Sequence, residues 1–505
     1  MNIRTDIEDS SPVEGDARKL AAQFLSRVRE DGVYLREIIK TLCHRAASEN
    51  EATAKAATRA VFTSLVEPLA DSFDPFAVSV YNRVFAQLID CCRKTDAGRA
   101  LARELAGFKI FDGQDLFARA ERLRSVTLLR GSTGRRPEMR RVAVLSRVTL
   151  GADVAVTSVI FERLKREFPK AEIVLAGGRK AAELFGGDPS LYFKEIDYLR
   201  SGTLIERLLS WVELAACTRE LTDKLKPGEC MIVDPDSRLT QLGLLPLAGE
   251  YLFFPSREYG YDTRRSLGEL TSAWLSEVFG SEETVLPRLY LKSSDRNAAA
   301  GLVKRMRHRG ARAVVTINFG VGENPLKRID DEFERSLVAS LIEQGASVIF
   351  DKGAGEDETR RANDVIAHAA QLSRDRRPTR IIEIDEARLP DLLNSDTLDA
   401  ELLVWSGRIG LLAALIAESD LYIGYDSAGQ HIAAAAGVPS IDVFAGFGSP
   451  RMLERWRPTG PASSRVIAVD TINERANSRA ILSDTLRHAK EMLEAGVGGQ
   501  RSGTI

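Results

Sequence analysis

The segment at residues 420–439 most constrains the fold, because it combines a strand, a tight turn and a helix. Residues 421–424 form a short apolar run, Asp426-Ser427 is a good N-cap pair, and the alanines that follow favour helix until Gly437 and Pro439 end it. A helix N-terminus with small residues presents free N–H groups and the positive end of the helix dipole. The segment therefore predicts either a phosphate-binding turn or an ordinary buried strand-to-helix turn.

Length and charge narrow the class of protein. A chain of 505 residues is long enough for about three domains of roughly 150 residues each. The net charge of −2 gives no electrostatic reason to expect nucleic acid as a partner. No stretch approaches the roughly 20 apolar residues that cross a bilayer, and the acidic, polar residues 1–16 are unlike a secretory signal. We therefore expect a cytoplasmic protein.

The cysteines and histidines do not indicate a metal or a disulfide framework. The five cysteines are odd in number and have no C-x-x-C spacing. The five histidines include no H-x-x-x-H pair. We expect buried free thiols, no metal and no cofactor.

The pattern of apolar and polar residues changes along the chain and predicts its domains. Residues 1–16 are expected to be a disordered tail, and residues 17–130 an all-helical domain, in which Asp74-Pro75 is a helix start signal. A polar, glycine-bearing linker at residues 131–137 follows.

Beyond the linker, short apolar runs alternate with amphipathic helices, which predicts parallel, doubly wound sheets of the α/β class. Two Rossmann-like domains are expected, at residues 138–290 and 291–495, with a flexible tail at 496–505. The predicted strands are Val142 to Leu145, Ile173 to Ala176, Tyr192 to Ile196, Met231 to Val233, Tyr251 to Phe254, Ala313 to Ile317, Ser347 to Phe350, Arg380 to Ile384, Leu421 to Ile423 and Ser440 to Phe444.

Ligands of such sheets bind beyond the carboxyl ends of the strands, and three turns there carry candidate residues. Asp153 lies in the turn after the first strand, where it could cap a helix or act as a general base. Lys327 follows a glycine-containing loop and suits phosphate oxygens, although a solvated lysine at a helix start is commoner. The acids at residues 351–358 suit a helix dipole, and Glu356 among them is a candidate ligand-binding residue.

Taken in order, these segments resemble glycosyltransferase family 9, which includes the bacterial lipopolysaccharide heptosyltransferases and has the two-domain GT-B fold. The resemblance extends from about Arg141 to Pro458. The matching phrases are Gly151-Ala152-Asp153, Phe168-Pro169-Lys170-Ala171-Glu172-Ile173, Leu326-Lys327-Arg328, Glu343-Gln344-Gly345-Ala346-Ser347-Val348, Asp420 through His431, and Trp456-Arg457-Pro458. The helical N-terminal domain is not part of the minimal family fold.

The resemblance implies transfer of a sugar, heptose or a related hexose, from a nucleotide-diphosphate sugar, with inversion and without a metal. It implies that Asp153 is the catalytic base and that Lys327 neutralises the leaving diphosphate. The remaining donor-binding residues that it implies lie at the start of the helix after residue 425: Asp426, Ser427, Ala428, Gly429, Gln430 and His431. Ala428 stands where the family has glycine.

The acceptor stays open at this point. A glycan, a lipopolysaccharide-type or lipid-linked molecule, or a protein are all candidates, and the helical domain could present one. The basic run from Lys304 to Arg312 is expected to be a solvated helix face, with peripheral membrane contact as the alternative. A nucleotide-sugar epimerase or a non-catalytic nucleotide-sugar-binding module would also be compatible with a GT-B scaffold.

Overall fold

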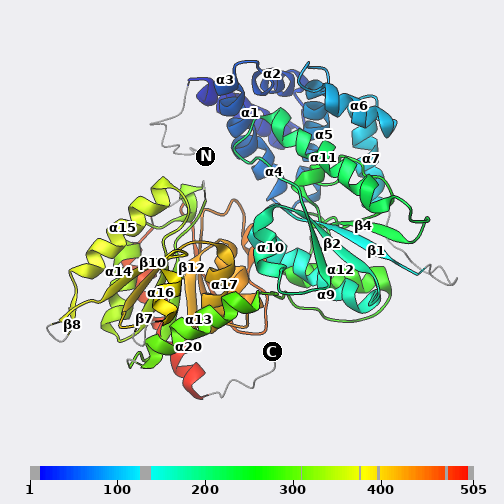
Figure 1. The fold of residues 1–505 in the computed structure, drawn as a ribbon. Coiled ribbons are helices and arrows are strands. Elements are labelled where there is room, and N and C mark those ends of the chain that lie inside the picture. The colour runs from blue at the N-terminus through cyan, green and yellow to red at the C-terminus, as the bar shows by residue number, and fades with distance from the viewer. Residues whose placement is uncertain are drawn as a thin grey trace. The chain divides into compact units, whose positions relative to one another are not determined.

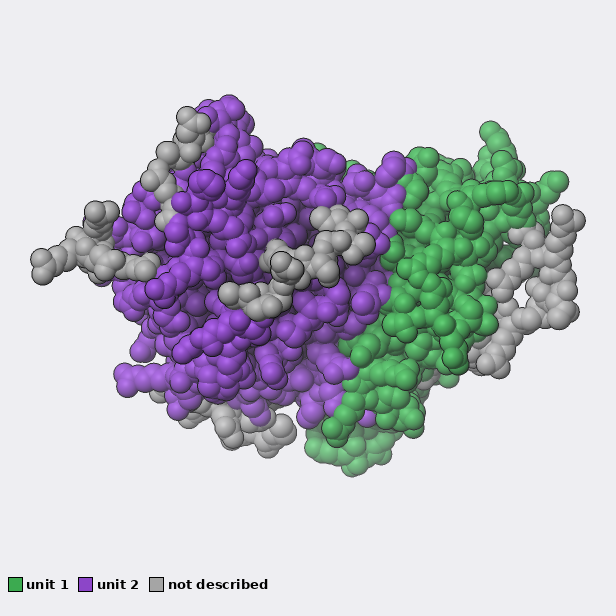
Figure 2. All heavy atoms as spheres, turned by 90° about the horizontal axis from the view of Figure 1, so that it is seen from below, with its two compact units in different colours: residues 1–148, 160–179, 190–285 green, residues 149–159, 180–189, 286–505 purple. Residues whose placement is uncertain are grey.

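The chain forms two compact units, which are coloured separately in Figure 2. The computed structural model describes residues 12–125, 138–308, 310–322, 324–374, 377–394, 398–472 and 476–498. Unit 1 comprises Met1–Val148, Ile160–Arg179 and Ser190–Val285, and unit 2 comprises Thr149–Val159, Lys180–Pro189 and Leu286–Ile505. Residues 1–11 of the predicted tail, the linker at 131–137 and residues 499–505 lie outside the described residues.

Helices make up the first part of unit 1 (Figure 1). They are α1 (Pro12–Asp31), α2 (Arg36–Ala46), α3 (Glu51–Val61), a π-helical turn (Phe62–Val66), α4 (Glu67–Ala70), α5 (Pro75–Cys92), α6 (Arg99–Gly107) and α7 (Gly113–Ser125). The start signal at Asp74-Pro75 is confirmed, because the Asp74 carboxylate accepts the N–H of Ala77 at 3.0 Å and α5 begins at Pro75.

Two of the predicted tail boundaries are wrong. Residues 12–16 are helical, because Glu14 is buried and its carboxylate pairs with Arg18 at 2.7 Å and with Arg59 of α3 at 3.3 Å. At the other end, α20 (Ser478–Gly498) extends three residues into the predicted tail at 496–505.

A five-stranded parallel sheet forms the rest of unit 1, in the order β3-β2-β1-β4-β5. Its strands are β1 (Arg141–Leu145), β2 (Glu172–Gly177), β3 (Leu191–Glu195), β4 (Cys230–Asp234) and β5 (Glu250–Phe253), each within a residue or two of its predicted place. Helix α11 (Leu204–Thr222) packs against β1 and also against α3, α5 and α6. The helices therefore share one hydrophobic core with the sheet: Phe62, Phe85 and Trp211 belong to the same buried cluster as Leu145 of β1.

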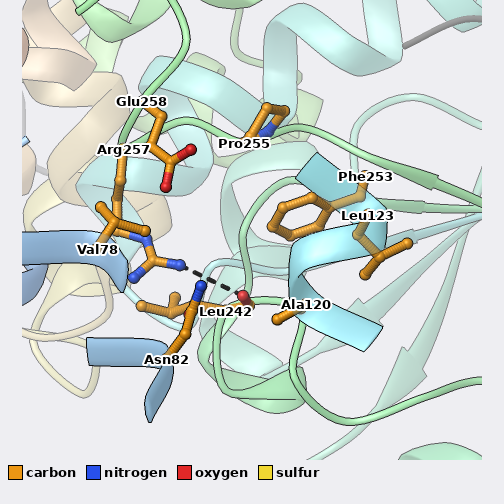
Figure 3. Close-up of a pocket in the computed structure, with 10 residues that line it drawn as sticks. Val78, Asn82, Ala120, Leu123, Leu242, Phe253, Pro255, Arg257 and Glu258 are labelled. Atoms are coloured by element: carbon orange, nitrogen blue, oxygen red, sulfur yellow. Dashed lines mark hydrogen bonds between the residues drawn. The ribbon is translucent and has the colours of Figure 1, made fainter. Parts of the chain in front are cut away.

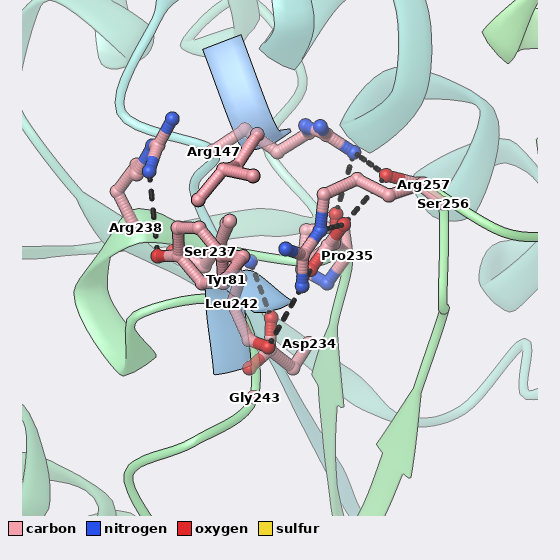
Figure 4. A network of polar contacts seen from close by, with 12 residues as sticks. Tyr81, Arg147, Asp234, Pro235, Ser237, Arg238, Leu242, Gly243, Ser256 and Arg257 are labelled. Carbon is pink, nitrogen blue, oxygen red and sulfur yellow. Dashed lines mark hydrogen bonds and ion pairs between the residues drawn. The ribbon is translucent and has the colours of Figure 1, made fainter. Parts of the chain in front are cut away.

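A polar network connects α5 with the carboxyl ends of the strands in unit 1 (Figure 4). The ring of Tyr81 lies under the guanidinium of Arg257 at 4.6 Å, and its hydroxyl accepts a hydrogen bond from Arg238 at 3.4 Å. Arg257 also donates two hydrogen bonds to the buried carboxylate of Asp236, from Nε at 3.0 Å and from Nη2 at 3.3 Å. The loop that follows β5 is therefore packed into the fold at Arg257.

A small cavity lies beside this network, lined by side chains of α5, α7 and the loops after β4 and β5 (Figure 3). Two of the lining residues, Asn82 of α5 and Arg257, each have one buried polar atom, Oδ1 and Nη1, that makes no hydrogen bond to a described residue. Helices and sheet thus meet at a polar as well as an apolar contact.

Unit 2 contains a seven-stranded parallel sheet in the order β10-β11-β7-β6-β12-β13-β14. Its strands are β6 (Val314–Asn318), β7 (Ser347–Asp351), β10 (Ile381–Asp385), β11 (Leu402–Ser406), β12 (Leu421–Tyr425), β13 (Ser440–Ala445) and β14 (Ser464–Val469); a separate hairpin pairs β8 (Ser373–Arg374) with β9 (Arg377–Pro378). The sequence patterns did not predict β11 or β14. β14 is an edge strand that is only half buried, so its apolar signal is weak.

Helices cover both faces of this sheet (Figure 1). One side carries α14 (Asp331–Glu343), α15 (Glu356–Ala370) and α20. The other carries α13 (Ser293–His308), α16 (Leu389–Asn394), α17 (Ile409–Glu418) and α18 (Ala428–Ala435). Within the basic run at 304–312, Arg305 donates a hydrogen bond to the carbonyl oxygen of Leu393, and Arg307 donates one to the carboxylate of Asp420. These two cations therefore connect α13 to neighbouring elements of unit 2. Among the described residues, no helix is both long and apolar enough to cross a membrane.

Candidate functional site

The carboxyl ends of β6 and β12 form the topological switch point of the second sheet. The chain leaves β6 toward β7 on one side, whereas β12 lies on the other side of β6. Loops that follow two such strands diverge and leave a crevice in which open α/β sheets bind ligands. Asn318 ends β6, and Asp426 directly follows β12. We call the residues around this point the switch-point site.

An ion pair forms the centre of this site. Lys327, at the end of a short 3₁₀ turn (Pro325–Lys327), places its Nζ 2.5 Å from Oδ2 of Asp426. The other carboxylate oxygen of Asp426 accepts a hydrogen bond from Nε2 of Gln430 at 2.8 Å. The side chains of Lys327 and Asp426 are 21 % and 7 % exposed, so the lysine remains accessible while the carboxylate is largely covered. The predicted candidates Lys327, Asp426 and Gln430 are therefore brought together.

Helix α18 begins at the site with its N–H groups uncapped by a side chain. Ser427 is the N-cap residue, but its side chain accepts no capping hydrogen bond; its Oγ instead lies 3.5 Å from Oδ1 of Asn318. The first-turn N–H groups and the positive end of the helix dipole are thus available to an anion. Ser427 and Ala428 are partly exposed here.

Two of the predicted donor contacts lie beneath the surface of the site. A Cβ atom on Gly429 would stand 2.1 Å from the hydroxyl of Tyr422 in β12, so Gly429 is required for packing of the helix on the strand. Gln430 is fully buried. The side chain of Gln430 therefore does not reach the surface of the site, whereas the backbone N–H groups of Gly429 and Gln430 belong to the first turn of α18. Their contact with a ligand stays a prediction.

His431 is buried and uncharged at neutral pH. Burial lowers the pKa of the imidazole to about 4; nearby Lys327 acts in the same direction and Asp426 opposes it. The ring stands edge-on to Trp456 of α19 (Pro450–Trp456), with centroids 5.9 Å apart. Trp456 belongs to the W-R-P phrase and helps to hold the imidazole.

The segment that contains Asp153 packs against α18 within unit 2. Gly151 of α8 (Leu150–Ala152) lies so close that an added Cβ would be 3.0 Å from Cδ2 of His431 and 3.3 Å from Cα of Ala428. A π-helical turn (Asp153–Thr157) and α9 (Ser158–Glu167) follow. Such turns occur frequently at functional sites.

Asp153 lies inside this helical segment and is not its N-cap. Thr149 holds the N-cap position, and the N–H of Asp153 donates to the carbonyl of Thr149 at 2.9 Å. Asp153 is 1 % exposed, and its carboxylate accepts a hydrogen bond from Oγ1 of Thr157 at 2.8 Å. The capping alternative is therefore wrong, and the carboxylate is covered in this structure.

Glu356 is separate from the ion pair. It is the exposed first residue of α15, after Gly355. Glu358, two residues later, instead links two loops of the site, since its carboxylate accepts the N–H of Gly322 at 3.3 Å and that of Ala354 at 2.8 Å. The sequence shows both acids in the first helical turn but does not say which of them turns inward.

Asn318 and Asp351 were not among the predicted residues. They end the adjacent strands β6 and β7, and the Asn318 amide donates a hydrogen bond to the Asp351 carboxylate. Burial raises the pKa of Asp351 to about 6. A polar residue that ends an otherwise apolar strand was the available signal for both.

No group of three or more histidine, cysteine, aspartate or glutamate side chains is arranged to hold a metal ion within the described part of the chain. Metal independence stays a prediction.

Comparison with solved structures identifies the fold. The chain is similar to a family 9 glycosyl transferase from Veillonella parvula, with 16 % identity, a TM-score of 0.50, and coverage of 72 % of this chain and 99 % of that one. The chain has the GT-B fold. Two further solved structures match less well. ADP-heptose lipopolysaccharide heptosyltransferase II of E. coli has 13 % identity and a TM-score of 0.47, with coverage of 71 % of this chain and 99 % of that one. An E. coli heptosyltransferase solved with ADP has 13 % identity and a TM-score of 0.45, with coverage of 70 % of this chain and 99 % of that one. No protein-family model and no curated protein sequence matches the chain.

The close approach at Gly429 predicts a destabilising substitution. We expect Gly429→Ala to lower stability by about 1–3 kcal/mol, because the new methyl group overpacks against Tyr422. Gly301, inside α13 of the same unit, has only side-chain ends nearby, so Gly301→Ala should be neutral or stabilise by up to about 1 kcal/mol. Thermal melting of both variants tests this; equal shifts would contradict it.

Asp442 of β13 predicts a pH dependence. Burial, with nearby Asp426, raises the pKa of this carboxyl to about 8. An unfolded aspartate titrates near about 3.9, so the folded state binds one proton more between these values and loses stability as pH rises through that window. Asp442→Asn removes this loss. The melting temperature of the variant minus that of the wild type should therefore rise from pH 4 to pH 8; a flat difference would contradict the prediction.

Proposed function

We propose that this chain is a glycosyltransferase that moves a sugar, heptose or a related hexose, from a nucleotide-diphosphate sugar to a hydroxyl of a glycan, a lipopolysaccharide-type or a protein acceptor. The observation that supports it most directly is the partly exposed Lys327, held by Asp426 beside the uncapped N-terminus of α18 at a sheet switch point. A cation and free N–H groups are suited to a diphosphate. The GT-B fold is compatible with this activity.

In the proposed reaction the acceptor hydroxyl attacks the anomeric carbon as the bond to the diphosphate breaks, which inverts the configuration. Charge develops on the departing diphosphate oxygen. Lys327 and the first N–H groups of α18 would stabilise it, so no metal is needed in this scheme. His431 contributes no charge, because its imidazole is neutral.

Asp153 is the proposed base that takes the proton of the acceptor hydroxyl. It lies on a segment that packs against α18, but it is covered and bonded to Thr157. Catalytic hydrogen bonds are often formed only in the substrate complex, so this arrangement is compatible with the role. The same burial also favours a second candidate function, a nucleotide-sugar-binding module that does not catalyse transfer. A cytoplasmic location stays a prediction.

A thermal-shift screen against ADP-, GDP-, UDP-, CMP- and dTDP-sugars, with and without EDTA, tests donor binding. We expect one nucleotide class to raise the melting temperature independently of metal. In Lys327→Met the affinity for that nucleotide should fall about tenfold to a hundredfold, because a hydrogen bond to a charged group is lost. Lys352→Met is the matched control, since Lys352 follows β7 and pairs with Glu383 at 2.8 Å. Equal affinities in both variants would remove Lys327 from the site.

Asp153→Asn tests the base with the donor identified by the screen. The amide keeps the size of the side chain and can still accept from Thr157, but it cannot take a proton. We expect transfer to fall by about 10²–10⁴-fold with donor affinity retained. Unchanged turnover would refute the assignment. Release of an epimerised nucleotide sugar without any acceptor would instead indicate an epimerase.

A further inference from the structure

Gln430 makes contacts that define the orientation of its amide group. Its Nε2 lies 2.8 Å from Oδ1 of Asp426, 3.3 Å from the carbonyl oxygen of Trp456 and 3.3 Å from Nε2 of His431. The Trp456 carbonyl oxygen can only accept hydrogen bonds, and an ionised carboxylate likewise only accepts. The atom that faces them must therefore be the amide nitrogen.

This orientation determines which nitrogen of His431 carries the proton. The amide has two N–H hydrogens: Asp426 accepts one at 2.8 Å, and the Trp456 carbonyl oxygen and Nε2 of His431, both at 3.3 Å, share the other in a three-centre hydrogen bond. Because an amide nitrogen donates but does not accept, Nε2 of His431 takes part in this bond only as an unprotonated acceptor. A proton on Nε2 would place two donors opposite each other at a fully buried position, which costs free energy. The neutral ring then carries its proton on Nδ1.

The second ring nitrogen is on the accessible side. Nδ1 makes no hydrogen bond to a described residue, and it is absent from the fully buried polar atoms that lack one. His431 lies in the first turn of α18, next to the uncapped helix start. An N–H group at Nδ1 therefore adds a hydrogen-bond donor to the switch-point site.

We propose that Gln430 is a positioning residue that holds His431 as the neutral Nδ1–H tautomer, so that His431 donates a hydrogen bond in the site and cannot accept a proton through Nε2. The partner of the Nδ1–H group of His431 would be an acceptor oxygen of the ligand. That last step rests on the proposed function, in which the oxygen belongs to the diphosphate or the sugar. The tautomer itself does not depend on it.

Two substitutions separate the possible roles of Gln430. Gln430→Met keeps an unbranched side chain of similar length but removes the donor, so we expect a mixture of His431 tautomers. Gln430→Glu replaces the donor by an acceptor, so Nε2 of His431 should become protonated. Gln344→Met is the matched control, because Gln344 is exposed at the end of α14, far along the chain from the site.

The test is nitrogen NMR of the full chain labelled with ¹⁵N in the histidine rings, which distinguishes the two tautomers directly. His431→Phe assigns the signal, and the other four histidines serve as internal references. We expect Nδ1 protonation in the wild type and in Gln344→Met, a mixture of the two tautomers in Gln430→Met, and Nε2 protonation in Gln430→Glu. Protonation on Nε2 in the wild type, or an unchanged tautomer in Gln430→Met, would overturn the proposal even if Gln430→Glu fails to fold.

Ligand affinity gives a second readout. With the nucleotide found by the thermal-shift screen, Gln430→Met should bind about tenfold more weakly while the wild-type melting temperature is nearly kept. An unchanged affinity would overturn the ligand contact of His431. If no nucleotide binds the wild type, the proposed function fails, whereas the NMR result still decides the role of Gln430.

Discussion

The buried carboxylate of Asp426 is the interaction on which the candidate site depends. It needs partners for both oxygens, because an uncompensated charge is costly at 7 % exposure. Lys327 supplies one partner from the loop after β6, and Gln430 supplies the other from α18. One carboxylate thus joins the two loops that diverge at the switch point. It also keeps the lysine at the start of α18, where an anion would enter.

Two buried groups near the Lys327–Asp426 pair carry little or no charge near neutral pH. Near neutral pH the carboxyl of Asp442 stays largely protonated and the imidazole of His431 is neutral, in both cases because of burial. The pair of Lys327 and Asp426 is neutral in sum. The uncapped start of α18 adds the positive end of a helix dipole beside this pair, and the protonated Asp442 adds no repulsion toward an anion there.

Several elements could be predicted from the sequence because their signals are local. The strand and helix at residues 420–439 follow from an apolar run, a run of alanines and a terminating glycine; Gly437 indeed has a φ of 72°. The predicted N-cap position is occupied by Ser427, but its side chain makes no capping hydrogen bond. The sequence shows Asn318 and Asp351 as polar residues at strand ends and Glu358 as an acid near a helix start, but it does not show that they meet in one site. Their roles depend on the parallel pairing of β6 with β7, which brings the ends of distant segments together.

The sequence by itself determined the α/β class, most of the strands and the residue types of the candidate site. Only the tertiary structure decided which side chains face the site. It buried Gln430 under Asp426, made Gly429 a packing contact with Tyr422, covered Asp153 and left Glu356 on the surface. The physical reason is that hydrogen-bond partners and burial are set by long-range packing, whereas helix and strand signals are set by near neighbours in the chain.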